Sequence, residues 1–125
     1  MAERTKFYID GAWVAPREGR TVPVVNPATE EVLYDVAVGG VADVEAAVAA
    51  ARAAWPAFAA TSREERVALL ARIVEIYARR MRDIGGAVSD EMGAPLSLAE
   101  RAHAGSGLSH FMTTHEALKT YAFEE

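Results

Sequence analysis

The chain has 125 residues, of which 51% are hydrophobic and 25% are charged, a composition that is typical of one folded domain and not of a disordered or fibrous protein. Its formal net charge of −5 argues against binding to nucleic acid or to an anionic membrane surface, because both depend on clustered Lys and Arg. It contains no cysteine, which excludes disulfides, thiolate metal ligands and a cysteine nucleophile from these residues.

Neither a secretory signal nor a membrane-spanning segment is predicted. Residues 1–6 are polar and charged, with no apolar signal region. The longest apolar-looking stretch, residues 46–60, is mostly alanine and is interrupted by Arg52 and Pro56. We therefore expect a cytoplasmic protein with no membrane partner.

Two pairs of strands are predicted within residues 1–38. Asp10-Gly11 lies between the apolar runs 7–9 and 12–14, and this dipeptide favours a two-residue hairpin turn. The second pair, residues 21–25 and 31–38, is joined by a turn that begins at Asn26-Pro27. Pro23 predicts an edge position for its strand, because proline has no N–H for a ladder.

From residue 40 the pattern becomes that of a helix. Asp43 is placed to bond back to the start of the first helix. This helix is predicted to end near Trp55, because Pro56 disfavours helical geometry in the residue before it.

Three further helical segments follow. A capping box at Ser62 opens a helix that is predicted to end at Gly85-Gly86, after a basic last turn. A short helical piece, residues 87–92, then reaches Gly93. Pro95 is predicted to be the first residue of a long final helix that extends to about Tyr121.

This order gives strands in residues 1–38 and helices in residues 40–125, with no linker or repeat. Taken alone, the order resembles an α+β domain. It is also compatible with the edge of a larger α/β protein built on a parallel sheet.

The three histidines do not form a predicted metal site. His103 and His110 share a helix face but stand about 10 Å apart along the axis, and His115 points elsewhere. Glu100 and His103 resemble half of a di-iron motif, but the second Glu-x-x-His is missing. Side chains facing solvent or a partner are the favoured interpretation.

Other candidate constellations also have a structural explanation that we favour. Gly105-Ser106-Gly107 follows no strand and matches neither a phosphate loop nor a nucleophile elbow. Two glycines inside a helix cost about 1 kcal/mol each, so close packing against a neighbouring helix is favoured over the wall of a cavity. Asp90 and Glu91 diverge on a helix and favour a role at a helix end or turn. The large aromatic residues are favoured as core or interface anchors: Trp13, Trp55 and Phe58.

Several stretches, in this order and spacing, resemble the start of the aldehyde dehydrogenase superfamily. They are residues 7–14, 25–32 and 43–52, then Arg66 and Leu70, and finally residues 91–95. The resemblance covers nearly the whole chain. Where many members carry Thr-Gly-Lys-Pro, this chain has Met92-Gly93-Ala94-Pro95, which resembles a bacterial branch of the family.

The resemblance implies a chain of α/β class that forms the N-terminal segment, residues 1–125, of the cofactor-binding domain. Family members oxidise an aldehyde to a carboxylate with NAD or NADP and are often homo-oligomers. Their cysteine nucleophile, glutamate base and dinucleotide-binding residues lie far downstream, so the Rossmann-like core and the catalytic domain are absent here. We therefore expect the isolated chain to hold no cofactor and to be inactive.

By the same resemblance, two sites are expected in the complete enzyme. Ala102 and Ser106 would line the mouth of the aldehyde tunnel. Backbone oxygens of Val24 and Val25, with Glu91, would hold a monovalent cation. The alternative is a stand-alone, non-catalytic helical module for binding or assembly; a dinucleotide-binding module acting alone fits less well.

Overall fold

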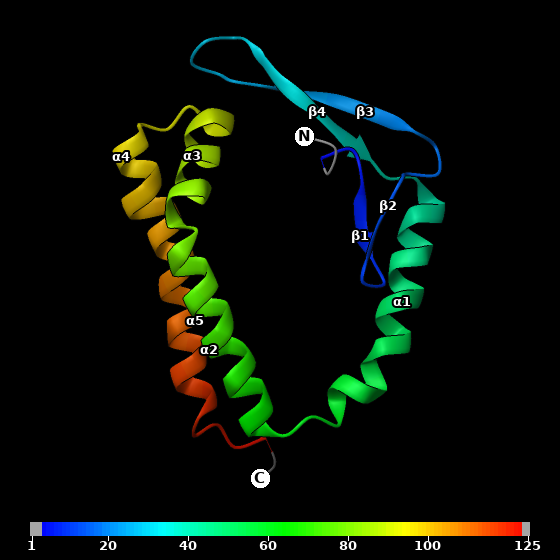
Figure 1. Cartoon of the computed structure of the whole chain (residues 1–125), viewed down its shortest axis with the longest axis vertical. Helices are drawn as coiled ribbons and strands as arrows, with labels where there is room; N and C mark the ends of the chain where they lie inside the picture. The colour runs from blue at the N-terminus through cyan, green and yellow to red at the C-terminus, as the bar shows by residue number, and fades with distance from the viewer. Residues whose placement is uncertain (1–3, 124–125) are drawn as a thin grey trace. The chain divides into compact units, whose positions relative to one another are not determined.

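The computed structural model describes residues 4–123. The chain forms two compact units, Met1–Ala60 and Thr61–Glu125, which are described separately. Figure 1 shows the elements in chain order: the last strand ends at Val38 and the first helix begins at Val41. The first unit holds all four described strands, and the second is helical.

The first unit opens with the predicted hairpin. β1 (Phe7–Ile9) pairs antiparallel with β2 (Ala12–Val14). Asp10 and Gly11 both have positive φ, 51° and 74°, as a type I′ turn requires. Across the ladder, the rings of Tyr8 and Trp13 lie 5.3 Å apart in a tilted arrangement, which is a stabilising cross-strand pair. The hairpin prediction is confirmed.

β3 (Arg20–Val25) and β4 (Val32–Val38) form a second antiparallel pair. The Asn26 side chain builds the turn between them, because its Oδ1 accepts from the N–H groups of Ala28 and Thr29 at 2.8 and 3.3 Å. Pro23 lies opposite Asp35, and in a two-stranded sheet every strand is an edge strand, as predicted from the proline.

The first helix, α1 (Val41–Ala59), begins where Asp43 bonds back to the backbone. Asp43 Oδ2 accepts from Gly40 N at 3.0 Å, and Oδ1 accepts from Arg17 N at 3.1 Å. The predicted stop at Trp55 is wrong, since Pro56 lies inside the helix. Pro56 removes only one N–H near the helix end, and its own carbonyl accepts from Ala60 N at 3.2 Å, so the last turn survives.

The second unit begins with α2 (Arg63–Arg79). The predicted capping box is confirmed: Glu65 N donates to Ser62 Oγ at 3.1 Å, and Ser62 N donates to Glu65 Oε2 at 2.7 Å. The pKa of Glu65 is lowered mainly by the bond from the Ser62 N–H to its carboxylate, and then by the Ser62 hydroxyl. The charged carboxylate therefore stabilises the start of the helix.

The predicted helix end at Gly85-Gly86 is also wrong. α2 ends at Arg79, and both glycines lie inside α3 (Met81–Met92). Gly85 is buried against the backbone of Glu100, so its missing side chain permits close helix packing instead of ending a helix. The short predicted piece, residues 87–92, is the second half of α3, which does end at Gly93 with φ 69°.

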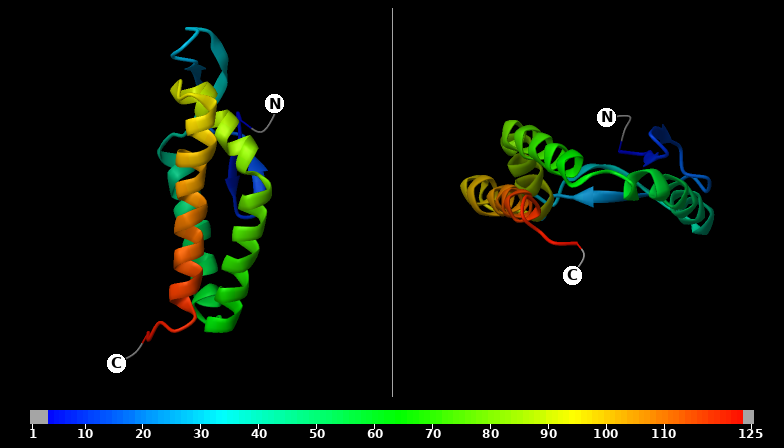
Figure 2. Two further views of the ribbon diagram at one scale, coloured as in Figure 1. Left: turned by 90° about the vertical axis from the view of Figure 1, so that its left-hand side faces the viewer. Right: turned by 90° about the horizontal axis from the view of Figure 1, so that it is seen from below.

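The final helix differs most from its prediction. Pro95 caps α4 (Leu96–Leu98), which continues into a π-helix, η1 (Ala99–Ala104), and then into α5 (Gly105–Leu118). The helix thus ends before Tyr121. Figure 2 shows α5 lying alongside α2, and the π-helix packs against α3.

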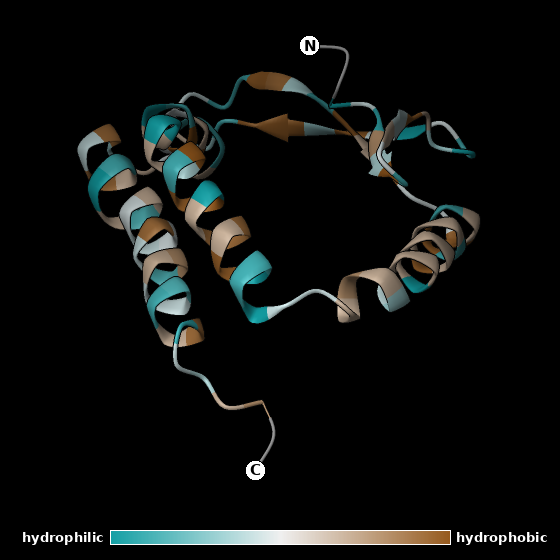
Figure 3. Ribbon diagram, turned by 60° about the horizontal axis from the view of Figure 1, so that its bottom comes forward, coloured by the Kyte–Doolittle hydropathy of each residue, from teal (hydrophilic) through white to brown (hydrophobic). Residues whose placement is uncertain are grey.

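Very few of the residues that the structure describes are fully buried. Among the described residues, the buried hydrophobic side chains are those of Ala99 and Ala104, and no large side chain is fully buried. The accessible surface is 9156 Å², whereas two compact units of half this mass would expose about 7,800 Å² in total. Figure 3 shows hydrophobic stretches on β3, β4 and α1. The units therefore leave much apolar surface uncovered.

Candidate functional site

Ala102 and Ser106, the predicted tunnel residues, lie on either side of the junction between the π-helix and α5. Both are exposed, while Ala99 and Ala104 on the same helix are buried. The inward face of the helix is therefore fixed by the two buried alanines, and the predicted pair lies away from it.

The π-helix is held on its inner side by α3. An added Cβ at Gly85 would lie 2.9 Å from Glu100 Cα and 3.2 Å from Glu100 N, so the two backbones are in direct contact. Further along, an added Cβ at Gly107 would lie 2.8 Å from Cζ of Tyr77. The prediction of close helix packing at this glycine pair is borne out at Gly107; near Gly105 the nearest atom lies 3.9 Å away.

The connection into this helix is held by side-chain bonds to the backbone. Ser89 Oγ donates to Ala94 O at 2.8 Å, which spans the left-handed turn at Gly93. Arg101 Nε donates to Ser97 O at 3.2 Å, in the turn where α-helical geometry gives way to the π-helix. Sequence reasoning found neither bond.

Val24 and Val25, two of the predicted cation ligands, lie at an irregularity in the β3–β4 ladder. Val24 is opposite Tyr34 and Val25 is opposite Val32, so Leu33 is an extra residue on β4. Such a bulge disrupts the ladder locally. Glu91 belongs to the other unit, near the end of α3. The cation site stays a prediction.

The histidines lie along the last helix without converging. Within residues 4–123 no group of three or more His, Cys, Asp or Glu residues could hold a metal ion. His103 and His110 are exposed, and His115 Nδ1 lies 3.2 Å from Glu116 Oε1. Lys119 Nζ donates to the same oxygen at 2.7 Å and is the main cause of the lowered pKa of Glu116.

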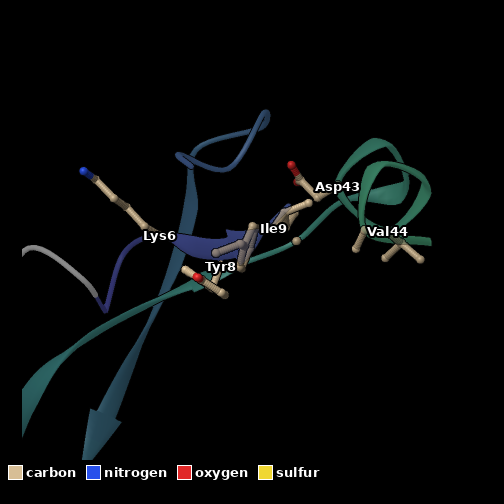
Figure 4. A pocket seen from close by; sticks show the side chains of 8 residues that line it. Lys6, Tyr8, Ile9, Asp43 and Val44 are labelled. Carbon is tan, nitrogen blue, oxygen red and sulfur yellow. The ribbon is translucent and has the colours of Figure 1, made fainter. Parts of the chain in front are cut away.

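A hollow of about 390 Å³ lies in the first unit where β1 meets the start of α1 (Figure 4). Its wall is mainly apolar, with Tyr8, Ile9 and Val44 beside Asp43 and Lys6. Each Asp43 oxygen accepts a backbone N–H bond, one from Gly40 and the other from Arg17. These bonds lower the pKa of the carboxyl, and the bond from Gly40 contributes most. An anchored carboxylate of lowered pKa is poorly suited to act as a general base near neutral pH.

Large apolar side chains cover the exposed faces of both units. Trp13, Trp55 and Phe58 are all substantially exposed, with Trp55 at 66%, so none is a core residue within its unit. A second hollow of about 610 Å³ runs along α5 beside Leu108 and Met112. Exposed apolar side chains of this size are suited to packing against other protein.

None of the helices in the described part of the chain is both long and apolar enough to cross a membrane. The titratable groups of residues 4–123 include no thiol. The arrangement described above positions helices and presents apolar faces, and it assembles no nucleophile with a base.

The chain is similar to known proteins along nearly its whole length. The model of the aldehyde dehydrogenase family matches residues 13–125. A Staphylococcus aureus protein named provisionally as an aldehyde dehydrogenase is 51% identical over all 125 residues, which span 26% of its own length. The chain thus spans about a quarter of that relative.

Solved structures agree. Aldehyde dehydrogenase C of Pseudomonas syringae, a cysteine-to-alanine mutant in complex with NAD⁺ and octanal, matches 99% of the chain with a TM-score of 0.97 and 43% identity. The Bartonella henselae aldehyde dehydrogenase matches 98% of it with a TM-score of 0.95 and 35% identity. In each case the match covers 26% of the solved chain. The chain belongs to the aldehyde dehydrogenase family and corresponds to its N-terminal part.

Proposed function

We propose that this chain is the N-terminal part of an enzyme that oxidises an aldehyde to a carboxylate with NAD or NADP, and that the chain alone is inactive. One observation carries the proposal: the chain matches a family of oxidoreductases along nearly its whole length, yet spans about a quarter of its relatives and contains no cysteine. In this account the nucleophile, the base and the cofactor site lie in the remaining three quarters.

The residues of this chain do not fit a dinucleotide. A pyrophosphate is commonly held at an open helix N-terminus, but at the starts of α1 and α2 a carboxylate already accepts from the N-cap N–H, and its negative charge disfavours a bound pyrophosphate. Asp43 accepts from Gly40 N, and Glu65 accepts from Ser62 N. The nicotinamide cofactor would supply the hydride acceptor from a site in the remainder of the protein.

The contribution of this chain is then to shape the path of the aldehyde. We place Ala102 and Ser106 on its wall, supported by their exposure on the side of the helix that faces away from Ala99 and Ala104. Both side chains are small, so the entrance would be wide enough for bulky or varied aldehydes. The octanal bound by the Pseudomonas syringae neighbour makes a medium-chain aldehyde a suitable first substrate to try.

A monovalent cation held by the Val24 and Val25 carbonyls with Glu91 is part of the same proposal. The irregularity of the β3–β4 ladder between Val24 and Val25 supports it, because a bulge locally disrupts the ladder hydrogen bonds. The complete enzyme is proposed to be a cytoplasmic homo-oligomer. The exposed aromatic side chains of Trp13 and Trp55 are suited to anchoring contacts with the remainder of the chain or with another subunit.

The test compares the complete protein with the isolated chain. Each is incubated with octanal and either NAD or NADP, and formation of the reduced cofactor is followed by absorbance. The proposal expects aldehyde-dependent reduction by the complete protein and none by the chain above a mock preparation. Cofactor reduction by the purified chain would contradict it, as would a complete protein that oxidises no aldehyde.

A further inference from the structure

The π-helix between α4 and α5 is an unusual element that the family assignment does not explain. A π-helix closes i→i+5 hydrogen bonds, so each such turn holds one residue more than an α-helical turn. One extra residue rotates everything that follows by about 100° relative to a continuous α-helix. The directions in which Ala102 and Ser106 face therefore depend on whether this π-helix forms.

The buried positions explain why the helix adopts this geometry. Ala99 and Ala104 are 0% and 1% exposed and stand five residues apart. In an α-helix a spacing of five would separate them by about 140° around the axis, and they could not both face α3. In a π-helix they lie on one face, so the packing of both alanines and the π geometry require each other.

Gly85 makes this packing possible. An added Cβ there would lie 2.6 Å from Cγ, 2.9 Å from Cα and 3.2 Å from N of Glu100. Two of these atoms belong to the backbone of the π-helix and cannot rotate away. The adjacent Gly86 has no atom within 4 Å of its added Cβ, so the close approach is specific to position 85.

Arg101 acts on the same element from its exposed side. Its Nε donates to Ser97 O at 3.2 Å and so bridges the turn in which the geometry changes. The bond is charge-assisted, which makes it stronger than a neutral one. Gly85 thus allows the inner face of the π-helix to pack closely on α3, and Arg101 on its exposed side hydrogen-bonds to the preceding turn.

We propose that Gly85 and Arg101 are positioning residues that hold the π-helix and thereby turn Ala102 and Ser106 toward the aldehyde. This rests on the proposed function, in which these two small side chains line the aldehyde path. If the π-helix reverts to α-helical geometry, Ser106, which follows it, turns by about 100°, and Ala102, which lies within it, turns by part of that angle, so the two small side chains no longer form the same wall.

The test is a substrate-length profile of the complete enzyme with Gly85→Ala, and with Gly86→Ala as the matched control on the same helix. We expect Gly85→Ala to lower the ratio of kcat/KM for octanal over propanal by about tenfold or more. The KM of the cofactor should change by less than about twofold, because a helix-packing change that acts only on the aldehyde wall leaves cofactor binding intact. Gly86→Ala should leave both values as in the wild type.

A second variant covers the case in which Gly85→Ala does not fold. Arg101→Met keeps most of the side-chain stem but removes the donor to Ser97 O, and it should lower the octanal-to-propanal ratio by about threefold. An unchanged ratio in the variants that fold would overturn the inference, as would an equal loss for both aldehydes. A wild-type complete protein that oxidises no aldehyde would instead overturn the proposed function itself.

Discussion

Replacing Gly107 by alanine tests how tightly α5 packs on α2. The added Cβ would lie 2.8 Å from Cζ and 3.4 Å from Cε2 of Tyr77, and closer still to the phenol oxygen. Tyr77 is half-buried, and its ring stands 5.7 Å from that of Phe111, so it has little room to move. Either the tyrosine leaves its site or the two helices separate.

Two opposing terms set the size of the effect. Alanine stabilises a helix interior by about 1 kcal/mol over glycine, whereas overpacking costs about 1 to 3 kcal/mol. The net destabilisation by Gly107→Ala should be about 0 to 2 kcal/mol. Gly86→Ala has open space and should stabilise by about 1 kcal/mol. The difference between the two variants isolates the steric cost.

Hydrogen exchange of the complete protein measures this locally, from the protection of amides in residues 63–79 and 105–118 for Gly107→Ala and in residues 81–92 for Gly86→Ala. Tyr77→Phe removes the closest atom, so adding it to Gly107→Ala should restore part of the lost protection. If Gly107→Ala raises protection as much as Gly86→Ala does, the close packing is wrong.

Three further outcomes are expected. The pKa of Asp43 is lowered by bonds from Gly40 N and Arg17 N. The stabilisation of the fold by the charged carboxylate is therefore fully present above the ordinary pKa of 3.8 and is lost as pH falls through the lower pKa of the folded state. In the complete protein, hydrogen exchange of these two amides should lose protection only below pH 3.8, and Asp43→Asn should remove this pH dependence. Gly93→Ala should destabilise the turn after α3 by about 1 to 2 kcal/mol, because φ there is 69°; denaturant unfolding that is unchanged would contradict this. Ala102→Trp in the complete enzyme should lower kcat/KM for bulky aldehydes far more than for short ones while sparing cofactor binding; an equal loss for all aldehydes would favour simple helix packing.

Local signals in the sequence were sufficient where one residue determines its neighbourhood. Asp10-Gly11 specifies a turn with two positive φ angles, and Ser62 with Glu65 specifies a helix start, and both are found as predicted. These features need no information from distant residues. The order of four strands followed by helices is predicted by the same kind of signal.

Predictions failed where packing outweighed local preference. The local sequence predicts a helix end at Gly85-Gly86, but Gly85 lies inside α3, where the backbone of Glu100 approaches it closely. Pro56 predicts the end of its helix, yet the turn that follows it is kept by the bond from Ala60 N to Pro56 O. Glycine and proline act on the backbone, and whether they end an element depends on partners that the local sequence does not reveal.

The π-helix could not be predicted for a related reason. Its signal is the spacing of five between two buried alanines, Ala99 and Ala104, in a segment that also contains the exposed Ala102. Composition does not distinguish the alanines, and only the approach of α3 does. Likewise, the bond between Arg17 N and Asp43 joins residues 26 positions apart. The candidate tunnel residues came from family resemblance and not from geometry.

The behaviour of the isolated chain tests most directly whether this chain is part of a larger fold. The total accessible surface of 9156 Å² exceeds the value of about 7,800 Å² for two compact units. With many large apolar side chains exposed, the purified chain is expected to bind a hydrophobic dye strongly or to aggregate, and to show no sharp thermal transition. The complete protein, under the same conditions, should bind little dye and unfold cooperatively. A monodisperse, monomeric chain with a sharp cooperative melt would contradict the account and favour a stand-alone module.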